Sequence, residues 1–548
     1  MKMIFLISVV LAFGGRIAGG DDWPQFRADA ARSGYTSERL SADLSLHWVY
    51  GARYVPRPAW RGHDTRMTFD YAPQPIIAEG MVFFAGSGDD KVYALDLARG
   101  SLMWRFFTEG PVRFAPAFFG GRVYVCSDDG YLYCLSARTG GLVWKKRAGP
   151  EGDMVLGNGR MVSRRPVRGA AAILDGILYF GGGIWPSEGI YLYSLDPETG
   201  KELWANDSSG GLVMDQPHPT ARARSGVSAQ GYLTAAGDTL LVSTGRAVPA
   251  GFDRADGTFR YFHLQRYGQV RPGPFAMLTD GFIFSGNSVF RAESGLLLLN
   301  KTPGSAAAVF PQDVVFAQGR TIRGITRSRL LLEEQIKDAD GKAVTKVSLS
   351  PASWSIQCSE ALGSCLIGAG ETVVAGTSNR KVVTADIRSK SVVMTADVDG
   401  EPLGLAAASG FLIVATDHGT IYCYGEKTAK DVIEIRPEPR RSGYGENRTF
   451  AAVAREIINR TGKTKGYCLD LGCGRGGLAY ELAKLTDLQI YAVESDPGKV
   501  TEARELLDAA GLYGTRVTVL QRDLAATGLP NYFADLVVSA ASVDKGGE

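Results

Sequence analysis

The sequence has no excess of charge of either sign, because 60 Lys and Arg residues face 58 Asp and Glu residues, for a net charge of +2. Proteins that bind nucleic acid through bulk charge need a basic excess, so that class is excluded. A disordered chain is excluded too, since 45% of the residues are hydrophobic. At about 100–200 residues per domain, 548 residues predict several domains, or one large repeat domain beside another.

Histidine and cysteine are scarce. The five His are scattered, and the seven Cys contain no C-x-x-C motif. A zinc site therefore has no support, and we predict no metal site. Two local pairs, Cys126 with Cys134 and Cys358 with Cys365, are candidates for disulfides in an exported protein, with free buried thiols as the alternative.

Long apolar runs are missing as well. The run from Ile4 to Phe13 has about ten residues, whereas a membrane-spanning helix needs about 20, so no transmembrane span is predicted. This run follows Met1-Lys-Met, and Ala18 and Gly20 fit the −3 and −1 positions of a signal-peptidase site. Residues 1–20 therefore predict a signal peptide and export to the periplasm or the extracellular space. A buried N-terminal strand is the alternative.

Glycine is abundant, with 68 residues or about 12% of the chain against a usual ~7%, and one Gly-containing pattern recurs. Its clearest copies span residues 82–104, 123–144 and 178–204, and each ends in Trp. Tyr, Val and Leu alternate with small residues, which predicts strands with two distinct faces. Asp129-Gly130 supplies the positive φ that a tight hairpin turn requires.

The period of this repeat, near 40 residues, predicts propeller blades of three or four antiparallel strands. About seven units are recognisable between residues 22 and 430, so we expect an all-β propeller of seven or eight blades. A β-sandwich array is the alternative architecture. Closure of a ring would remove the free strand edges that invite aggregation.

The repeat Val-Tyr-Ala-Leu-Asp-x-x-Thr-Gly-x-x-x-Trp resembles that of the quinoprotein, or PQQ-like, propellers, and the opening Asp22-Trp-Pro-Gln-Phe-Arg27 is similar to their start. The resemblance implies that Trp104, Trp144 and Trp204 are structural. Quinoprotein dehydrogenases also use a vicinal Cys-Cys pair over the quinone. No Cys-Cys dipeptide occurs here, so PQQ and an oxidoreductase function are not favoured. The resemblance favours a non-catalytic propeller that offers a face to a protein or envelope partner.

The composition changes near residue 430, and residues 431–447, with Pro437 and Pro439, are expected to be a linker. Residues 448–548 then alternate between helical and strand patterns. The expected helices span 449–460, 478–485 and 497–510, and the expected strands span 467–471, 490–493, 517–520 and 536–538. This order is that of half a doubly wound parallel sheet, which is typical of nucleotide-binding domains.

Acidic residues end three successive strands of this region, at Asp470, Glu494 and Asp523. The first strand runs into a glycine loop, whose backbone can approach a ligand closely at a helix N-terminus. Glu494 ends the second strand, where a carboxylate can bind ribose hydroxyls. The candidate cofactor-binding residues are Asp470, Gly472, Cys473, Gly474, Gly476, Glu494, Asp523 and Leu524.

This pattern resembles the class I S-adenosylmethionine-dependent methyltransferases. The resemblance implies that Asp470, Gly472 and Gly474 face the methionine part of S-adenosylmethionine. It also implies that Glu494 holds the ribose and that Asp523 with Leu524 reads adenine. A Rossmann-like fold that binds no cofactor is the alternative.

Sheets of that family have seven strands, whereas this chain ends at Glu548, just past the fourth. We therefore expect a partial domain, either a fragment of a longer protein or a degenerate one. Neither the methyl acceptor nor a catalytic residue can be named. The two halves also conflict, because the N-terminus predicts export while S-adenosylmethionine is a cytoplasmic metabolite.

Overall fold

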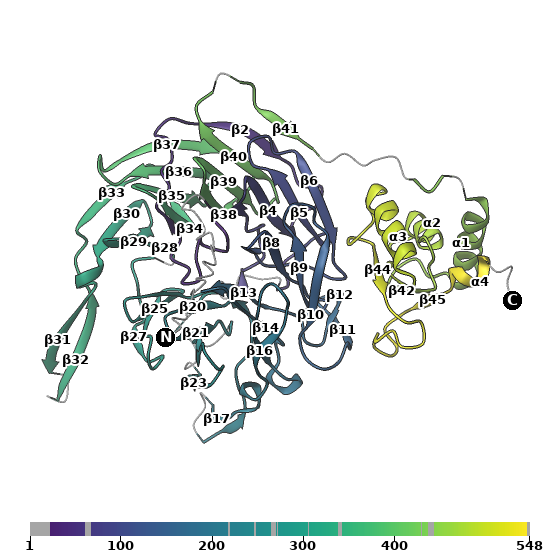
Figure 1. Ribbon diagram of the computed structural model, residues 1–548, viewed down its shortest axis with the longest axis horizontal. Helices are drawn as coiled ribbons and strands as arrows, with labels where there is room; N and C mark the ends of the chain where they lie inside the picture. The colour runs from purple at the N-terminus through teal and green to yellow at the C-terminus, as the bar shows by residue number, and fades with distance from the viewer. Residues whose placement is uncertain are drawn as a thin grey trace, which may run out of the picture.

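A computed structural model of the chain has two parts, a ring of β-sheets and a smaller α/β part at the C-terminus (Figure 1). The expected signal peptide, residues 1–20, lies outside the described residues, as does some of the expected linker 431–447. The structure describes residues 22–60, 67–216, 220–245, 248–264, 270, 272–304, 306–337, 342–428, 430–436, 443–445 and 447–544.

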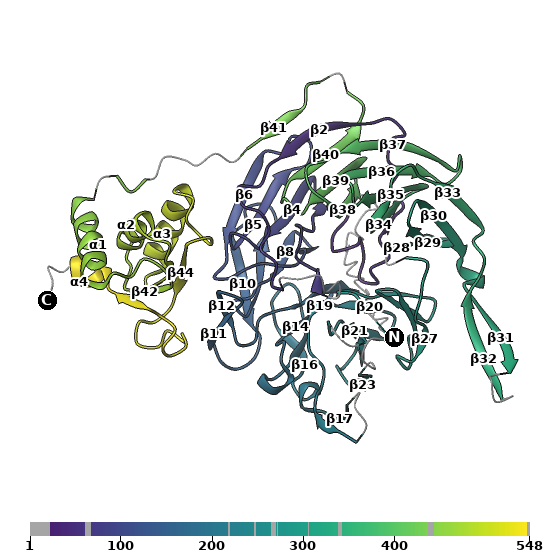
Figure 2. The same ribbon diagram turned by 180° about the vertical axis from the view of Figure 1, so that it is seen from behind.

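Eight four-stranded antiparallel blades form the ring within the described residues, which confirms the expected propeller and fixes the number of blades (Figures 1 and 2). Blades one to four comprise β3 (Ile76–Ala78), β4 (Met81–Gly86), β5 (Lys91–Asp96) and β6 (Leu102–Phe107); β7 (Ala117–Phe119), β8 (Arg122–Cys126), β9 (Tyr131–Ser136) and β10 (Leu142–Arg147); β13 (Gly169–Leu174), β14 (Ile177–Gly182), β15 (Tyr191–Leu195) and β16 (Glu202–Asn206); and β20 (Thr234–Ala236), β21 (Thr239–Val242), β22 (Ala250–Asp253) and β23 (Phe259–Tyr261).

Blades five to eight continue the same order around the ring. They comprise β24 (Met277–Thr279), β25 (Phe282–Ser285), β26 (Ser288–Arg291) and β27 (Leu297–Leu299); β28 (Ala306–Val309), β29 (Asp313–Gln318), β30 (Thr321–Thr326) and β33 (Trp354–Gln357); β34 (Leu362–Ala369), β35 (Thr372–Thr377), β36 (Lys381–Asp386) and β37 (Ser391–Asp397); and β38 (Pro402–Ala408), β39 (Phe411–Thr416), β40 (Ile421–Glu426) and β2 (Leu44–Tyr50).

Blade eight closes the ring, because its outer strand β2 comes from the N-terminal end of the chain and pairs antiparallel with β40. Short strands extend three blades in parallel, namely β19 (Gly231–Tyr232) beside β13, β1 (Tyr35–Thr36) beside β34, and β41 (Ile433–Ile435) beside β2. Three further hairpins leave the ring, formed by β11 (Met154–Gly157) and β12 (Arg160–Ser163), β17 (Val213–Asp215) and β18 (Arg222–Arg224), and β31 (Leu331–Lys337) and β32 (Ala343–Leu349).

The repeated tryptophan joins four of the blades, blades eight, one, two and three, to the blade that follows. Its indole N–H donates to a backbone carbonyl in the following blade, from Trp48 to Leu97 (2.8 Å), Trp104 to Ala137 (2.7 Å), Trp144 to Glu198 (3.1 Å) and Trp204 to Arg254 (3.1 Å). The turn glycine of the next blade lies against the indole. A Cβ on Gly140 would lie 2.6 Å from the ring of Trp104, so only glycine fits. These tryptophans are structural in this chain.

The segment 22–36 crosses the inner ring and hydrogen-bonds to blades one to seven in order. Its backbone bonds pair Trp23 with Ile77, Pro24 with Phe118, Ala30 with Ala235, Ala31 with Leu278, Ser33 with Val309 and Gly34 with Gly368. The Gln25 side chain bonds to the third blade, because it donates to the Ile173 carbonyl and accepts from the Ile173 N–H. The Arg27 guanidinium donates to the Leu366 carbonyl (3.1 Å), and Arg32 donates to the Leu233 (2.8 Å) and Ala171 (2.9 Å) carbonyls. The segment thereby satisfies inner-strand N–H groups and carbonyls that would otherwise be buried without partners.

The seven cysteines are free thiols. The register explains why Cys126 and Cys134 do not pair, since Cys126 lies opposite Leu132 while Cys134 lies opposite Tyr124. No helix among the described residues is long and apolar enough to cross a membrane.

The C-terminal domain holds a parallel sheet of strand order β44-β43-β42-β45. Its elements are α1 (Arg448–Thr461), β42 (Tyr467–Leu471), α2 (Gly477–Leu485), β43 (Gln489–Glu494), α3 (Pro497–Ala509), β44 (Val517–Gln521), β45 (Leu536–Val538) and α4 (Ala540–Asp544). The Asp496 side chain accepts from the Lys499 N–H (3.0 Å) and, with Pro497 in the first turn, sets the start of α3. Most of these elements begin and end within one residue of the expected bounds.

Candidate functional site

The glycine loop lies at the carboxyl end of β42. Gly472, Gly474 and Gly476 all have positive φ, at 68°, 57° and 78°, a conformation that favours glycine. The backbone N–H of Gly472 donates to the Val493 carbonyl at 2.9 Å, which holds the loop against β43. Helix α2 follows, and its N-cap Gly476 has no side chain to satisfy the first N–H groups. These first N–H groups have no intrahelical partner, as at any helix N-terminus.

Glu494 ends β43 beside this loop and is 6% exposed. One carboxylate oxygen accepts from the Gly474 N–H (2.9 Å), and the other from the N–H groups of Ser495 (3.0 Å) and Asp496 (3.1 Å). These three amides fix the orientation of the carboxylate. A carboxylate has about four acceptor positions, so Glu494 keeps capacity for a ligand hydroxyl.

Asp470 is fully buried in β42. Its Oδ1 accepts from the Ala540 N–H at 3.0 Å, at the start of α4. The side chain thus connects the end of the first strand to the segment that follows the fourth.

Asp523 and Leu524 lie just past the end of β44. Asp523 is exposed, and its Oδ1 accepts from the Ala525 N–H (2.8 Å), which forms a local turn. Leu524 is 42% exposed. A Cβ placed on Gly472 would lie 3.7 Å from Leu524 Cδ1 and 2.9 Å from the Ala541 Cβ. The structure therefore brings the glycine loop, Leu524 and the start of α4 together.

Cys473 is the member of the candidate set whose side chain turns away from the loop surface. It is 2% exposed and packs in the core under the helices, and burial raises the pKa of its thiol. Its backbone N–H donates to the Val493 carbonyl at 3.1 Å. Cys473 therefore contributes backbone conformation and packing to the loop.

Three residues that contribute to this site carried no signal in the sequence. Ala540 and Ala541 line it through a backbone N–H and a methyl group, which no motif marks. Tyr444 lies in the expected linker, and its hydroxyl donates to the Arg475 carbonyl at 2.7 Å. A Cβ on Gly476 would lie 2.8 Å from that hydroxyl oxygen, so Tyr444 covers the glycine loop.

The propeller holds a second candidate site, a cavity of about 850 Å³ beside the N-terminal segment. Seven of its lining residues are aromatic, and Glu401 supplies a carboxylate. Its aromatic lining residues are Phe26, Phe69, Tyr71, Tyr232, Phe275, Phe284 and Phe316. Among the residues that the structure describes, no three His, Cys, Asp or Glu side chains form a group that could hold a metal ion.

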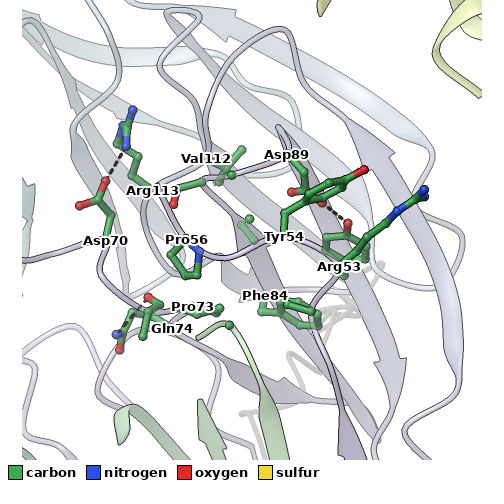
Figure 3. Close-up of a pocket in the computed structure, with 18 of the residues that line it drawn as sticks. Arg53, Tyr54, Pro56, Asp70, Pro73, Gln74, Phe84, Asp89, Val112 and Arg113 are labelled. Carbon is green, nitrogen blue, oxygen red and sulfur yellow. Dashed lines mark hydrogen bonds and ion pairs between the residues drawn. The ribbon is translucent and has the colours of Figure 1, made fainter. Parts of the chain in front are cut away.

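A smaller pocket of about 30 Å³ lies in the propeller near the C-terminal domain (Figure 3). Arg113 and Asp70 pair on one side of this pocket (2.5 Å), while Tyr54, Asp89 and Arg53 lie on the other. Arg53 donates to the Asp508 carbonyl (3.0 Å) and Tyr54 to the Gly511 carbonyl (2.5 Å) of the C-terminal domain. The wall of this pocket is thus part of a contact between the two parts of the chain.

Comparison with protein families agrees with both parts. The sequence model described as outer membrane protein assembly factor BamB matches residues 59–183 and 168–433, which is more than half of the chain. The chain belongs to this family. Residues 468–545 of this BamB-type propeller protein match a second model, described as a methyltransferase domain.

Curated relatives match this BamB-type protein over part of the propeller. The chain is 30% identical over 171 residues to "Alcohol dehydrogenase (quinone), dehydrogenase subunit" of Gluconobacter oxydans (strain 621H), which covers 27% of this chain and 22% of that protein. It is 25% identical over 203 residues to "Quinohemoprotein alcohol dehydrogenase" of Comamonas testosteroni, covering 33% and 25%. The chain therefore spans about a quarter or less of the length of these relatives.

Solved structures show the same fold. The quinohemoprotein alcohol dehydrogenase ADHIIG of Pseudomonas putida HK5 aligns with a TM-score of 0.51 at 14% identity, covering 80% of this chain and 86% of that one. The quinohemoprotein alcohol dehydrogenase of Comamonas testosteroni aligns with a TM-score of 0.51 at 15% identity, covering 80% and 85%. At this identity the likeness concerns the fold alone.

Arg27 is the basic residue in the described lining of the 850 Å³ cavity, and its guanidinium already binds the backbone carbonyls of Arg32 and Leu366. Burial lowers the pKa of Arg27 to about 10, while nearby Asp29 opposes this shift. The described lining of this cavity therefore offers a single basic side chain, and that side chain is already bound to backbone carbonyls.

Proposed function

We propose that the C-terminal domain binds S-adenosylmethionine and transfers its methyl group to an acceptor of unknown identity, with the propeller as its scaffold. The observation that carries the proposal is Glu494, whose carboxylate is held by three backbone amides beside the glycine loop and keeps acceptor capacity. The cofactor, when bound, supplies an electrophilic methyl group. The chain's own residues bind and orient it.

The site residues divide this work by their chemistry. The glycine loop and the first N–H groups of α2 suit the polar methionine end of the cofactor. Glu494 suits the ribose hydroxyls, and Leu524 with the backbone after Asp523 offers an apolar and hydrogen-bonding surface for adenine. The cradle at Gly472 has no room for a side chain, which fits a ligand approaching the backbone closely.

Calorimetric titration of the full chain with S-adenosylhomocysteine tests this proposal. We expect binding by the wild type and its loss in Glu494→Ala, because the variant removes the ribose acceptor. Glu456→Ala, on the exposed surface of α1, is the matched control and should bind like the wild type. A folded wild-type sample that produces no binding heat would refute the cofactor assignment.

A second candidate function is a non-catalytic propeller that binds a protein or envelope partner. The match to the family described as outer membrane protein assembly factor favours it. It requires export, which the predicted signal peptide 1–20 would provide. The N-terminal residue of the purified chain tests export, since cleavage after Gly20 would leave Asp21 first, whereas an intact Met1 would argue for a cytoplasmic enzyme.

A further inference from the structure

One face of the C-terminal sheet is covered by helices α1 to α3, whose side chains form one core with the inward residues of the strands. Doubly wound sheets are normally covered by helices on both faces. In the described residues between β44 and β45, from 522 to 535, no helix is present to cover the second face. That face carries large apolar side chains, among them Leu469, Leu471, Tyr491, Val493 and Leu520.

The propeller hairpin β11–β12 covers this second face together with Leu529 and Phe533 from the loop before β45. Met154 and Met161, from the hairpin β11–β12, are 1% and 2% exposed and pack with Tyr491, Val493 and Leu520 in one buried cluster. The Met161 N–H also donates to the Tyr491 hydroxyl oxygen at 2.8 Å. A propeller hairpin thus packs on the sheet face that helices α1 to α3 do not cover.

The propeller also holds the outer edge of β44. Glu109 Oε1 accepts from the Gln521 N–H at 3.1 Å, at the residue that lies opposite Glu494 in the sheet register. The same oxygen accepts from the Arg504 guanidinium at 3.0 Å. An edge N–H that would need water is thereby bound by a buried carboxylate.

The loop that carries Asp523 and Leu524 is bound on both of its flanks. Before it, the Arg522 guanidinium donates to the Gly152 carbonyl at 3.1 Å. After it, the Gly528 carbonyl accepts from the Met154 N–H at 2.8 Å. Both partners belong to the propeller segment at β11.

We propose that Met154, Met161 and Glu109 of the propeller are positioning residues for the cofactor site, and that the propeller thereby sets the affinity of the C-terminal domain for its cofactor. The inference rests on the proposed function. It follows that the two parts fold as one unit and work in the same compartment. These three residues act on the site indirectly, through β43, β44 and the loop after β44.

Two substitutions in the full chain test the inference. Met161→Asp places a charge against the apolar sheet face, and Met103→Asp is the matched control, since Met103 is 54% exposed on blade one. We expect Met161→Asp to weaken S-adenosylhomocysteine binding at least tenfold and to speed amide hydrogen exchange in residues 517–529, with Met103→Asp unchanged in both. Glu109→Gln, which removes a charge at nearly constant size, provides a milder variant should Met161→Asp not fold.

The outcomes separate the inference from the proposed function. Unchanged affinity and unchanged exchange in folded Met161→Asp and in Glu109→Gln would overturn the inference while leaving the cofactor assignment intact. Absence of binding in the wild type itself would instead overturn the proposed function. In that case faster exchange in residues 517–529 of the variants would still show that the propeller orders this loop.

Discussion

The Glu109 carboxylate of blade one and the Arg504 guanidinium of α3 lie 3.0 Å apart across the boundary between the propeller and the C-terminal domain. The two residues are 395 positions apart in the sequence. Three further ion pairs surround this contact, joining Lys91 to Asp508 (2.6 Å), Arg105 to Asp508 (3.0 Å) and Arg105 to Glu505 (2.5 Å). The boundary is thus a buried and charge-complementary interface.

The pair of Glu109 and Arg504 should be strongly coupled, because the two side chains are only 8% and 13% exposed. We expect a double-mutant cycle with Glu109→Gln and Arg504→Gln to give a coupling of about 1–3 kcal/mol. The measurement is urea unfolding of the full chain followed by helical circular dichroism, since the described α-helices lie in the C-terminal domain. The exposed pair of Glu456 and Arg460 is the control and should couple by about 0.3–0.5 kcal/mol. Equal coupling in both pairs would contradict the interface.

Trp104 should stabilise the propeller through both its ring and its N–H. Trp104→Phe leaves the Ala137 carbonyl without its 2.7 Å partner, at a cost of about 1–3 kcal/mol. Trp104→Ala also creates a cavity, and about 3–5 kcal/mol is expected. Differential scanning calorimetry of the full chain measures both. Trp185→Ala, at a position that is 41% exposed, should change the unfolding temperature little, and a similar loss there would argue against the joining role.

Arg27 should be required as an arginine. Arg27→Lys keeps the charge, but its single ammonium cannot reproduce the fork that binds the Arg32 and Leu366 carbonyls. We expect a loss of about 1–3 kcal/mol for each buried carbonyl left without a partner. Thermal unfolding measures the loss, with Arg39→Lys at an exposed position as the control. A wild-type unfolding temperature in Arg27→Lys would refute this role.

Asp129 should make stability depend on pH. Burial, and then the nearby charge of Glu109, raise the pKa of Asp129 to about 6, above the value of about 3.9 expected in the unfolded chain. The folded state therefore binds more protons between pH 4 and 6, and the contribution of Asp129 to the free energy of unfolding falls as the pH rises through this window.

The difference in unfolding free energy between wild type and Asp129→Asn isolates this effect. We expect this difference to change by about 2–3 kcal/mol between pH 4 and pH 7. Relative to Asp129→Asn, the wild type should be less stable at the higher pH. Glu109→Gln should reduce the shift, because it removes the second cause of the raised pKa. A difference that does not vary with pH would show that Asp129 titrates normally.

The elements with strong local signals were predicted closely from the sequence. The expected strand 467–471 is β42, and Asp496-Pro497 starts α3 as expected, because capping and glycine turns act over a few residues. The blade repeat was predicted equally well, because its clearest copies share the alternation of large apolar and small residues, the turn glycines and the final Trp. The number of blades stayed open between seven and eight because the copies between residues 260 and 370 carry few of these signals.

Sequence by itself determined the local units of this protein, the blades, the glycine loop and the three strand-end acids, since each depends on neighbours a few residues away. Only the tertiary structure decided how those units meet. In the folded chain the Cys473 side chain lies in the core, and residues 22–36 hydrogen-bond to seven blades. Glu109 binds Arg504 and the Gln521 N–H. Such contacts join residues hundreds of positions apart in the sequence. The residues next to a single carboxylate or methionine do not indicate which distant residue it will contact in the folded protein.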